Sequence, residues 1–187
     1  MTEIRIVGLA RTLDGRWAAQ IQANLGADVL GVELRKAMKR ADGAPLIDNP
    51  DGGRDAAYFH AANCGKTSIV ADFRDAVDRE GVQALIRDAD VLIEISRSAA
   101  SPDTASTMAA LPRKSGLVYC SITGFGQDGA YAHRAGYDFI VQDMSVIIDL
   151  GPIARKIRVA VADIMTSHAV IRHTTFATSP TASDRVD

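Results

Sequence analysis

A glycine-rich stretch with a tyrosine and a carboxylate just beyond it is the first part of the sequence that could do chemistry. Residues 117–140 read "LVYCSITGFGQDGAYAHRAGYDFI". The apolar run at 117–122 predicts a buried strand, glycines follow closely, and Tyr137 and Asp138 stand where a helix is expected to begin. A strand that runs into a glycine-rich loop and then a helix is a common way for α/β proteins to hold a ligand's phosphate. We therefore predict a ligand-binding loop here.

Asp163 is a second candidate for chemistry. It follows the apolar "VAVA" and precedes "IMTSHAVI", so we expect it at a turn between a strand and a helix. A positioned and desolvated carboxylate can act as a covalent nucleophile, and the same placement also suits a helix N-cap. Asp138 could equally serve only the dipole of its own helix, and Tyr137 could be an ordinary half-buried aromatic. The residues alone leave these alternatives open.

Short β-branched runs alternate with helical patterns along most of the chain. Helical spacing of apolar residues appears after the first and third runs, in "DGRWAAQIQANLG" and "DAVDREGVQALIRDA", and shorter helices are expected at 56–63 and 102–114. This alternation predicts an α/β fold with a mainly parallel, Rossmann-like sheet and helices on both faces. The expected strands are 4–9, 28–34, 67–73, 90–96 and 116–122.

Two regions lack such patterns. Residues 35–56 are polar and rich in Gly, Pro, Asp and Asn, which predicts a long surface loop. Residues 170–187 show no apolar period and are rich in Ser, Thr and Pro. We therefore expect one α/β domain over residues 1–169 and a disordered tail over 170–187.

Arginines recur where the predicted strands end. The carboxyl ends of parallel strands meet at one edge of a sheet, and ligands bind beyond that edge. Although any single arginine there could be a solvated surface charge, their recurrence favours an anionic ligand, because the guanidinium donates to phosphate in pairs. The residues concerned are Arg11, Arg35, Arg74 and Arg97.

Composition narrows the function classes. Among 187 residues, 47% are hydrophobic and 24% charged, with a net charge of −2, so the basic face that nucleic-acid binding needs is not expected. No apolar run approaches membrane-spanning length. Cys64 and Cys120 are far apart, which favours two reduced thiols in a cytoplasmic protein, and the four histidines show no spacing typical of metal ligands, so no metal site is predicted.

Several segments resemble the N-terminal part of the class III coenzyme A transferases, the group that includes formyl-CoA transferase and carnitine CoA-transferase. The resemblance implies that Asp163 is the nucleophile, that Tyr137 and Asp138 form an active-site pair, and that coenzyme A or acyl-CoA is bound as a substrate rather than as a tightly held cofactor. It further implies a carboxylic acid as second substrate and a homodimer in the full-length family. The implied coenzyme-binding residues are Arg11, Tyr58, Arg74, Arg97, Gly124 and Gly126. The segments that carry the resemblance, in family order, are "IRIVGLARTLDGRWAAQIQANLGADVLGVE", "AAYFHAANCGKTSIVADFRD", "ADVLIEISR", "GLVYCSITGFGQDGAYAHRAGYDFIVQDMS" and "VAVADIMTSH".

The chain also departs from the family pattern. Asp14 and Arg16 stand in the first turn, where members usually have small residues and a proline, and the common "ENFRPG" reads "EISRSA". Members are much longer, so we expect a truncated chain with a fold incomplete relative to the full family fold and with activity near zero. Two alternatives remain: a 2-methylacyl-CoA racemase-like isomerase, disfavoured because racemases carry a histidine in place of Tyr137, and a non-catalytic CoA-binding remnant.

Overall fold

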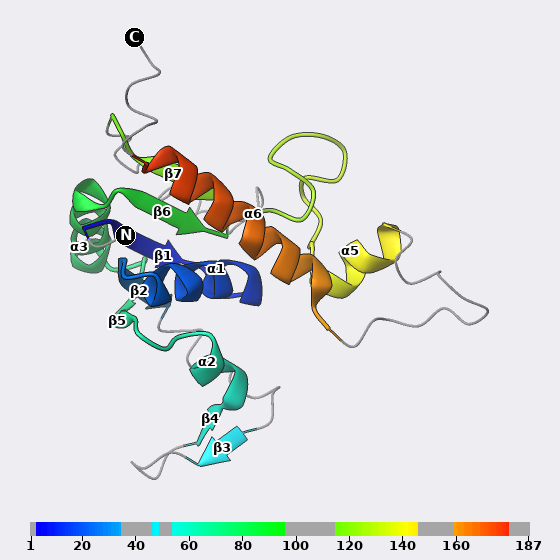
Figure 1. The fold of residues 1–187 in the computed structure, drawn as a ribbon, viewed down its shortest axis with the longest axis horizontal. Coiled ribbons are helices and arrows are strands. Elements are labelled where there is room, and N and C mark those ends of the chain that lie inside the picture. The colour runs from blue at the N-terminus through cyan, green and yellow to red at the C-terminus, as the bar shows by residue number, and fades with distance from the viewer. Residues whose placement is uncertain (1–2, 35–45, 49–53, 96–114, 146–158, 180–187) are drawn as a thin grey trace.

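Five parallel strands form the central sheet, in the order β5-β2-β1-β6-β7 (Figure 1). The computed structural model describes residues 3–34, 46–48, 54–95, 115–145 and 159–179. Ile6 of β1 lies between Val29 of β2 and Val91 of β6 in the register of the sheet. The predicted parallel sheet is therefore confirmed, with β2 as long as expected and the other four strands slightly shorter. The strands are β1 (Arg5–Leu9), β2 (Asp28–Leu34), β5 (Thr67–Ala71), β6 (Val91–Glu94) and β7 (Val118–Ser121).

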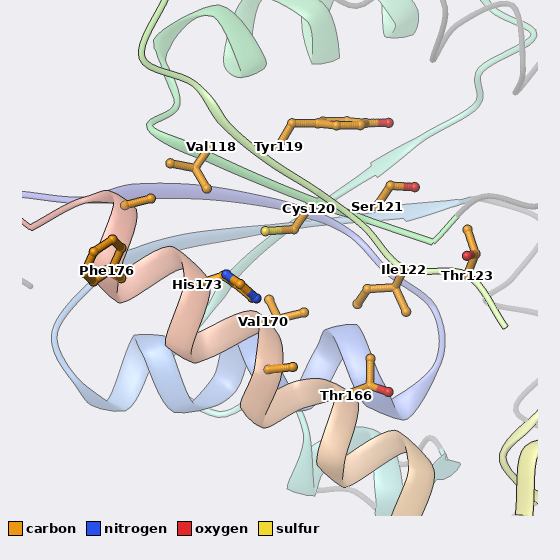
Figure 2. A pocket seen from close by; sticks show the side chains of 12 residues that line it. Val118, Tyr119, Cys120, Ser121, Ile122, Thr123, Thr166, Val170, His173 and Phe176 are labelled. Atoms are coloured by element: carbon orange, nitrogen blue, oxygen red, sulfur yellow. The ribbon is translucent and has the colours of Figure 1, made fainter. Parts of the chain in front are cut away.

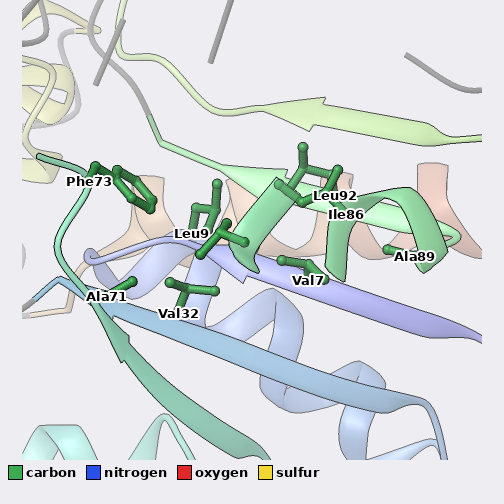
Figure 3. Close-up of a cluster of buried hydrophobic side chains, with 9 residues drawn as sticks. Val7, Leu9, Val32, Ala71, Phe73, Ile86, Ala89 and Leu92 are labelled. Atoms are coloured by element: carbon green, nitrogen blue, oxygen red, sulfur yellow. The ribbon is translucent and has the colours of Figure 1, made fainter. Parts of the chain in front are cut away.

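Helices cover both faces of this sheet, as the sequence predicts. On one face, α1 (Leu13–Asn24) and α6 (Val161–Ala177) lie side by side, and Ala18 and Val170 pack against Ile6 and Ile93. On the other face, α3 (Ala76–Asp88) contributes buried aliphatic side chains to a second cluster (Figure 3). Because neighbouring residues of a strand point to opposite faces, each central strand contributes side chains to both clusters.

The local sequence explains where helix α3 begins and which of its faces is buried. The carboxylate of Asp75 accepts hydrogen bonds from the amides of Val77 and Asp78, which is the bonding of a helix N-cap. Val82 and Ile86, one turn apart, then face the sheet and are almost completely buried. The cap and the apolar stripe together place this helix after β5.

Helix α6 corrects two expectations. It begins at Val161, so "VAVA" is not a strand, and it continues to Ala177, so the expected disordered tail is wrong for residues 170–177. The buried face of α6 explains the error: Ser167 and Thr174 lie on it beside Val170, and hydroxyl side chains give no apolar period. Thr174 Oγ1 donates to Gln22 Oε1 of α1 at 2.9 Å, which satisfies both buried groups. Residues 180–187 lie outside the described part.

A small hairpin corrects the predicted loop at 35–56. Strands β3 (Leu46–Asp48) and β4 (Arg54–Ala56) pair antiparallel, and α2 (Ala57–Ala61) follows directly. Strands of three residues are too short for a period of two to be recognised. The helix expected at 102–114 falls outside the described residues, and α5 (Asp138–Met144) begins where the "GYD" pattern predicts a helix.

Candidate active site

The predicted arginines that the structure describes lie just after the carboxyl ends of parallel strands. Arg11 follows β1 and is exposed, and Arg74 follows β5. The Arg74 guanidinium donates through Nε and Nη2 to the two carboxylate oxygens of Asp72, and half of its side chain stays exposed. Arg35 and Arg97 lie outside the described residues. This edge therefore presents exposed cationic groups from two strands.

Asp163 lies at the same edge, in the first turn of α6. The helix has Ala160 at its N-cap position, so Asp163 is its third residue and not the cap. One turn later, the hydroxyl of Ser167 donates to the backbone oxygens of Asp14 at 2.6 Å and of Asp163 at 2.8 Å. Because Asp14 lies in the first turn of α1, shortly after β1, this contact holds the start of α6 against the carboxyl edge of the sheet. The Asp163 side chain is half-buried there.

Asp138 caps α6 from another helix. Its Oδ1 accepts hydrogen bonds from the amides of Ala162 at 2.8 Å and Asp163 at 3.4 Å, and its Oδ2 accepts from Gln142 Nε2 at 2.5 Å. The residue is 8% exposed. Ala160 provides no side-chain cap, so a carboxylate from α5 satisfies amides at the positive end of α6. Asp138 and Asp163, two of the predicted site residues, are therefore adjacent, and these hydrogen bonds of Asp138 hold α6 in place.

Tyr137 occupies the N-cap position of α5 and is half exposed. Its ring stacks on that of Phe139, with centroids 5.9 Å apart and planes 3° from parallel. Tyr58, the other tyrosine singled out by the resemblance, lies in α2, and its side chain is outside the described part. A helical pattern does not predict this stacked pair, because residues two apart in a regular helix do not face each other.

The glycine-rich loop is closed by a contact between two glycines. A Cβ on Gly136 would lie 2.2 Å from the Cα of Gly124, so the two backbones touch where the loop leaves β7 and where it approaches α5. Gly126 and Gly129 have φ of 82° and 104°, which other residues rarely adopt. Within the loop, the ring of Tyr131 contacts Phe125 and lies 4.4 Å from the Arg134 guanidinium carbon. Gly136 is thus as important to the loop as Gly124, although it was not among the residues predicted from the sequence.

Arg16 forms an ion pair inside the sheet edge. Its Nη2 donates to Glu33 Oε2 at 2.7 Å, its Nε donates to the Arg11 backbone oxygen at 3.2 Å, and the guanidinium carbon lies 5.2 Å from the Phe59 ring centroid. Both side chains of the pair are close to buried. An arginine in this turn departs from the family pattern, and here it fixes the backbone that carries Arg11. A buried pair of this kind specifies geometry more reliably than it adds stability.

Lys66 connects the turn before β5 to α1. Its Nζ donates to the backbone oxygens of Arg16 at 2.7 Å and Ala62 at 2.6 Å, and to Asn63 Oδ1 at 3.4 Å. These three acceptors match the three donors of an ammonium group, which leaves Lys66 a structural role. Burial, and then the nearby Arg16 charge, lower the pKa of Lys66 to about 8.

We expect this lowered pKa to appear in the pH dependence of stability. An unfolded lysine has a pKa of about 10.4, so between about pH 8 and about pH 10 the unfolded chain binds more protons than the folded one. The free energy of unfolding of the parent protein should therefore rise with pH relative to Lys66→Met, by about 1 kcal/mol after allowance for solvent screening. Urea unfolding of both proteins at a series of pH values measures this difference. The prediction would be contradicted if the free energy of unfolding changed equally with pH in both proteins.

A groove of about 540 Å³ runs between β7 and α6, with one wall from each element (Figure 2). Its lining is mainly apolar, and the face of α6 that lines it carries Thr166 one turn after Asp163. Burial raises the pKa of the Cys120 thiol in this groove, so the thiol stays protonated. Among the described residues, no helix is long and apolar enough to cross a membrane, and no group of three or more His, Cys, Asp or Glu could hold a metal ion.

Comparison with known sequences decides the family. The sequence pattern described as "CoA-transferase family III" matches residues 1–179. The chain belongs to CoA-transferase family III. The match extends through α6, so the resemblance found in the sequence is confirmed.

Curated relatives within this family are named as CoA-transferases. The chain is 44% identical over 177 residues to a succinate–glutarate CoA-transferase from Agrobacterium fabrum, covering 89% of this chain and 44% of that protein. It is 33% identical to an acetyl-CoA:oxalate CoA-transferase from Acetobacter aceti, covering 76% of this chain and 36% of the relative. The chain thus spans less than half the length of these relatives.

A solved structure shares the fold. A crystal structure of a CAIB/BAIF family protein from Brucella suis superposes with a TM-score of 0.80 at 41% identity, covering 94% of this chain and 48% of that one. A Mycobacterium tuberculosis crystal structure superposes with a TM-score of 0.79 at 21% identity, which supports the fold alone. The α/β fold of this chain is therefore that of about half of a family member.

Proposed function

We propose that the protein transfers coenzyme A from an acyl-CoA thioester to a carboxylic acid, with Asp163 as the nucleophile. The observation that best supports this choice is the different placement of the two carboxylates. Asp138 is 8% exposed and uses both oxygens to hold α6 and Gln142, whereas Asp163 is half-buried in the first turn of α6 at the sheet edge. The named relatives, which act on succinate and glutarate or on oxalate, make short dicarboxylates reasonable substrates to test first.

The proposed chemistry proceeds through covalent intermediates on one carboxylate. An Asp163 oxygen attacks the thioester carbonyl, the carbon–sulfur bond breaks, and the CoA thiolate leaves a mixed anhydride behind. The thiolate then attacks the aspartyl carbonyl, which releases the donor acid and forms an aspartyl-CoA thioester. The acceptor carboxylate attacks that thioester, and the returning thiolate takes the acceptor's acyl group. Asp163 is regenerated as a carboxylate.

The remaining predicted residues have binding roles in this proposal. Coenzyme A would lie across the carboxyl edge of the sheet and contact the arginines that follow the strands, with backbone amides of the glycine loop facing the developing oxyanion. Tyr137 and Asp138 would border the acyl group. The homodimer and the cytoplasmic location remain predictions from the sequence. The proposed coenzyme contacts are Arg11, Tyr58, Arg74, Arg97, Gly124 and Gly126.

The isomerase alternative is less well supported. Removing and returning a proton beside a thioester needs two groups able to act as acid and base at neutral pH. A phenol such as that of Tyr137 is a poor base at neutral pH, and Asp138 caps α6 through Oδ1. Both named relatives are transferases.

We expect CoA binding to depend on the arginines of the sheet edge. Replacing both Arg11 and Arg74 by Ala should weaken binding about tenfold at low salt, since hydrogen bonds to charged groups contribute more than neutral ones. The loss should shrink at high salt, where exposed charges are screened. Calorimetric titration with CoA measures this, with Arg87→Ala as control because Arg87 is exposed near the end of α3. Unchanged affinity in the double variant would contradict the proposed site.

Overall transfer is tested with succinyl-CoA as donor and glutarate as acceptor. Chromatography of the CoA products separates transfer, which forms glutaryl-CoA, from hydrolysis, which forms only free CoA. Formation of glutaryl-CoA supports the proposal and would contradict the activity near zero that is expected from the sequence. CoA binding without glutaryl-CoA or any covalent intermediate would favour the non-catalytic alternative.

A further inference from the structure

Gln142 connects three segments that meet at the start of α6. It lies one turn after Asp138 in α5 and is completely buried. Its Nε2 donates to Asp138 Oδ2 at 2.5 Å and to the backbone oxygen of Val159 at 3.0 Å. Val159 directly precedes the N-cap residue of α6. One side-chain amide therefore holds both the carboxylate that caps α6 and the backbone that leads into it.

The orientation of Asp138 depends on this contact. With Oδ2 held by Gln142, Oδ1 faces the amides of Ala162 and Asp163. A carboxylate that accepts bonds through both oxygens has its plane fixed. The position of the Asp163 backbone thus follows from the Gln142–Asp138 bond through the Asp138–amide bonds.

Gln142 also has a feature that packing alone does not explain. Its Oε1 is buried and finds no hydrogen-bond partner among the described groups. An unsatisfied buried oxygen is destabilising, and an apolar side chain of the same volume would avoid it. A glutamate would bring a second negative charge against Asp138. The neutral amide is the side chain of this length that donates to both a carboxylate and a carbonyl.

We propose that Gln142 is a positioning residue for the Asp163 nucleophile. It acts through Asp138 and the Val159 carbonyl, and its complete burial keeps it from contacting a substrate. The role of Asp163 as a nucleophile rests on the proposed function. The other part of the proposal, called the mechanical part below, is that Gln142 holds the first turn of α6, and it is independent of the proposed function.

Amide hydrogen exchange tests the mechanical part. Gln142→Met keeps the side-chain volume and removes both donated bonds. Exchange of peptides that cover residues 160–165 should accelerate about tenfold, because hydrogen bonds to a charged group are lost, while residues 170–176 of the same helix should change less than about twofold. Gln83→Met on α3 is the matched control and should leave both regions unchanged. No acceleration at 160–165, or equal acceleration along the whole helix, would overturn the proposal.

Gln142→Glu provides a second variant with a pH signature. At neutral pH its carboxylate repels that of Asp138, so exchange at 160–165 should again accelerate. At acid pH the two carboxyl groups share a proton, and one can donate to the other, so protection should return relative to Gln142→Met after correction for intrinsic exchange rates. A loss of packing alone would not recover with acid, and absence of recovery would count against the proposed contact.

Chemical trapping tests the link to the nucleophile. Hydroxylamine added with succinyl-CoA attacks the aspartyl carbonyl of the mixed anhydride, the carbon–oxygen bond breaks, succinate leaves, and Asp163 becomes a hydroxamate that mass spectrometry detects. Gln142→Met should slow this about tenfold while CoA affinity stays within about twofold. Equal rates in both proteins would overturn the positioning role. No hydroxamate in the parent protein would instead contradict the proposed function, and exchange would still decide the role of Gln142.

Discussion

Replacing Asp163 by Asn is expected to reduce acyl transfer from succinyl-CoA by at least about a thousandfold, as loss of a covalent nucleophile does in other enzymes. The amide has nearly the same shape and remains compatible with the third position of α6. It cannot form a mixed anhydride, however, because its nitrogen and oxygen are poor nucleophiles. The expected loss is therefore in the rate of chemistry and not in CoA affinity, and single-turnover kinetics with calorimetric CoA titration separates the two.

Asp143→Asn is the matched control for this prediction. Asp143 lies on α5, five residues after Asp138, and its side chain is exposed. The same chemical change at this position should leave both transfer and binding near the parent values. Full transfer in Asp163→Asn, or an equal loss in Asp143→Asn, would show that Asp163 is not the nucleophile.

Gly136→Ala is expected to have the largest effect on stability. The added Cβ would lie 2.2 Å from the Cα and 3.0 Å from the nitrogen of Gly124, and backbone atoms cannot turn aside as a flexible side chain can. Overpacking of this kind costs about 1–3 kcal/mol or more, which lowers the melting temperature of a chain of this length by several degrees. Because Gly136 directly precedes Tyr137 and Asp138, the cap on α6 should loosen as well.

Gly81→Ala makes a control with the opposite sign. Gly81 lies inside α3, and an added Cβ there would meet nothing within 4 Å. Alanine has a higher helix propensity than glycine, so this variant should be more stable by about 0.5–1 kcal/mol. Thermal unfolding of the two variants measures both changes. A melting temperature of Gly136→Ala equal to or above that of the parent would contradict the close glycine contact.

The sheet could be predicted from sequence because its signals are local. The runs around Ile6, Val29 and Val91 are apolar and β-branched, and the chain between them shows helical spacing. The second half of α6 could not be predicted in this way. The buried face of α6 carries Ser167 and, in the second half, Thr174. Their hydroxyls bond to partners far away in sequence, and hydrophobic periodicity does not detect such residues.

The sequence suggests candidate site residues, but it does not show the contacts that hold them together. Arg11, Arg74 and the glycine loop follow strands, so their common edge follows from the parallel topology. The hydrogen bond by which Asp138 caps α6 joins it to Ala162, 24 positions away, and no local pattern predicts it. The same is true of the Gly124–Gly136 contact and of Gln142, which a helical pattern treats as one more polar residue. These features depend on how distant segments pack.

Oxygen transfer to Asp163 tests the central claim most directly. The protein is incubated with succinyl-CoA and with succinate that carries ¹⁸O in its carboxylates, so donor and acceptor are the same acid. In the proposed mechanism the labelled carboxylate attacks the aspartyl thioester and the thiolate then takes the succinyl group, which leaves a labelled oxygen on the aspartate. A single turnover labels the protein, so slow turnover does not obscure the result. We predict ¹⁸O in the peptide that contains Asp163 and none in the Asp143 peptide, and an unlabelled Asp163 after prolonged incubation would contradict the account.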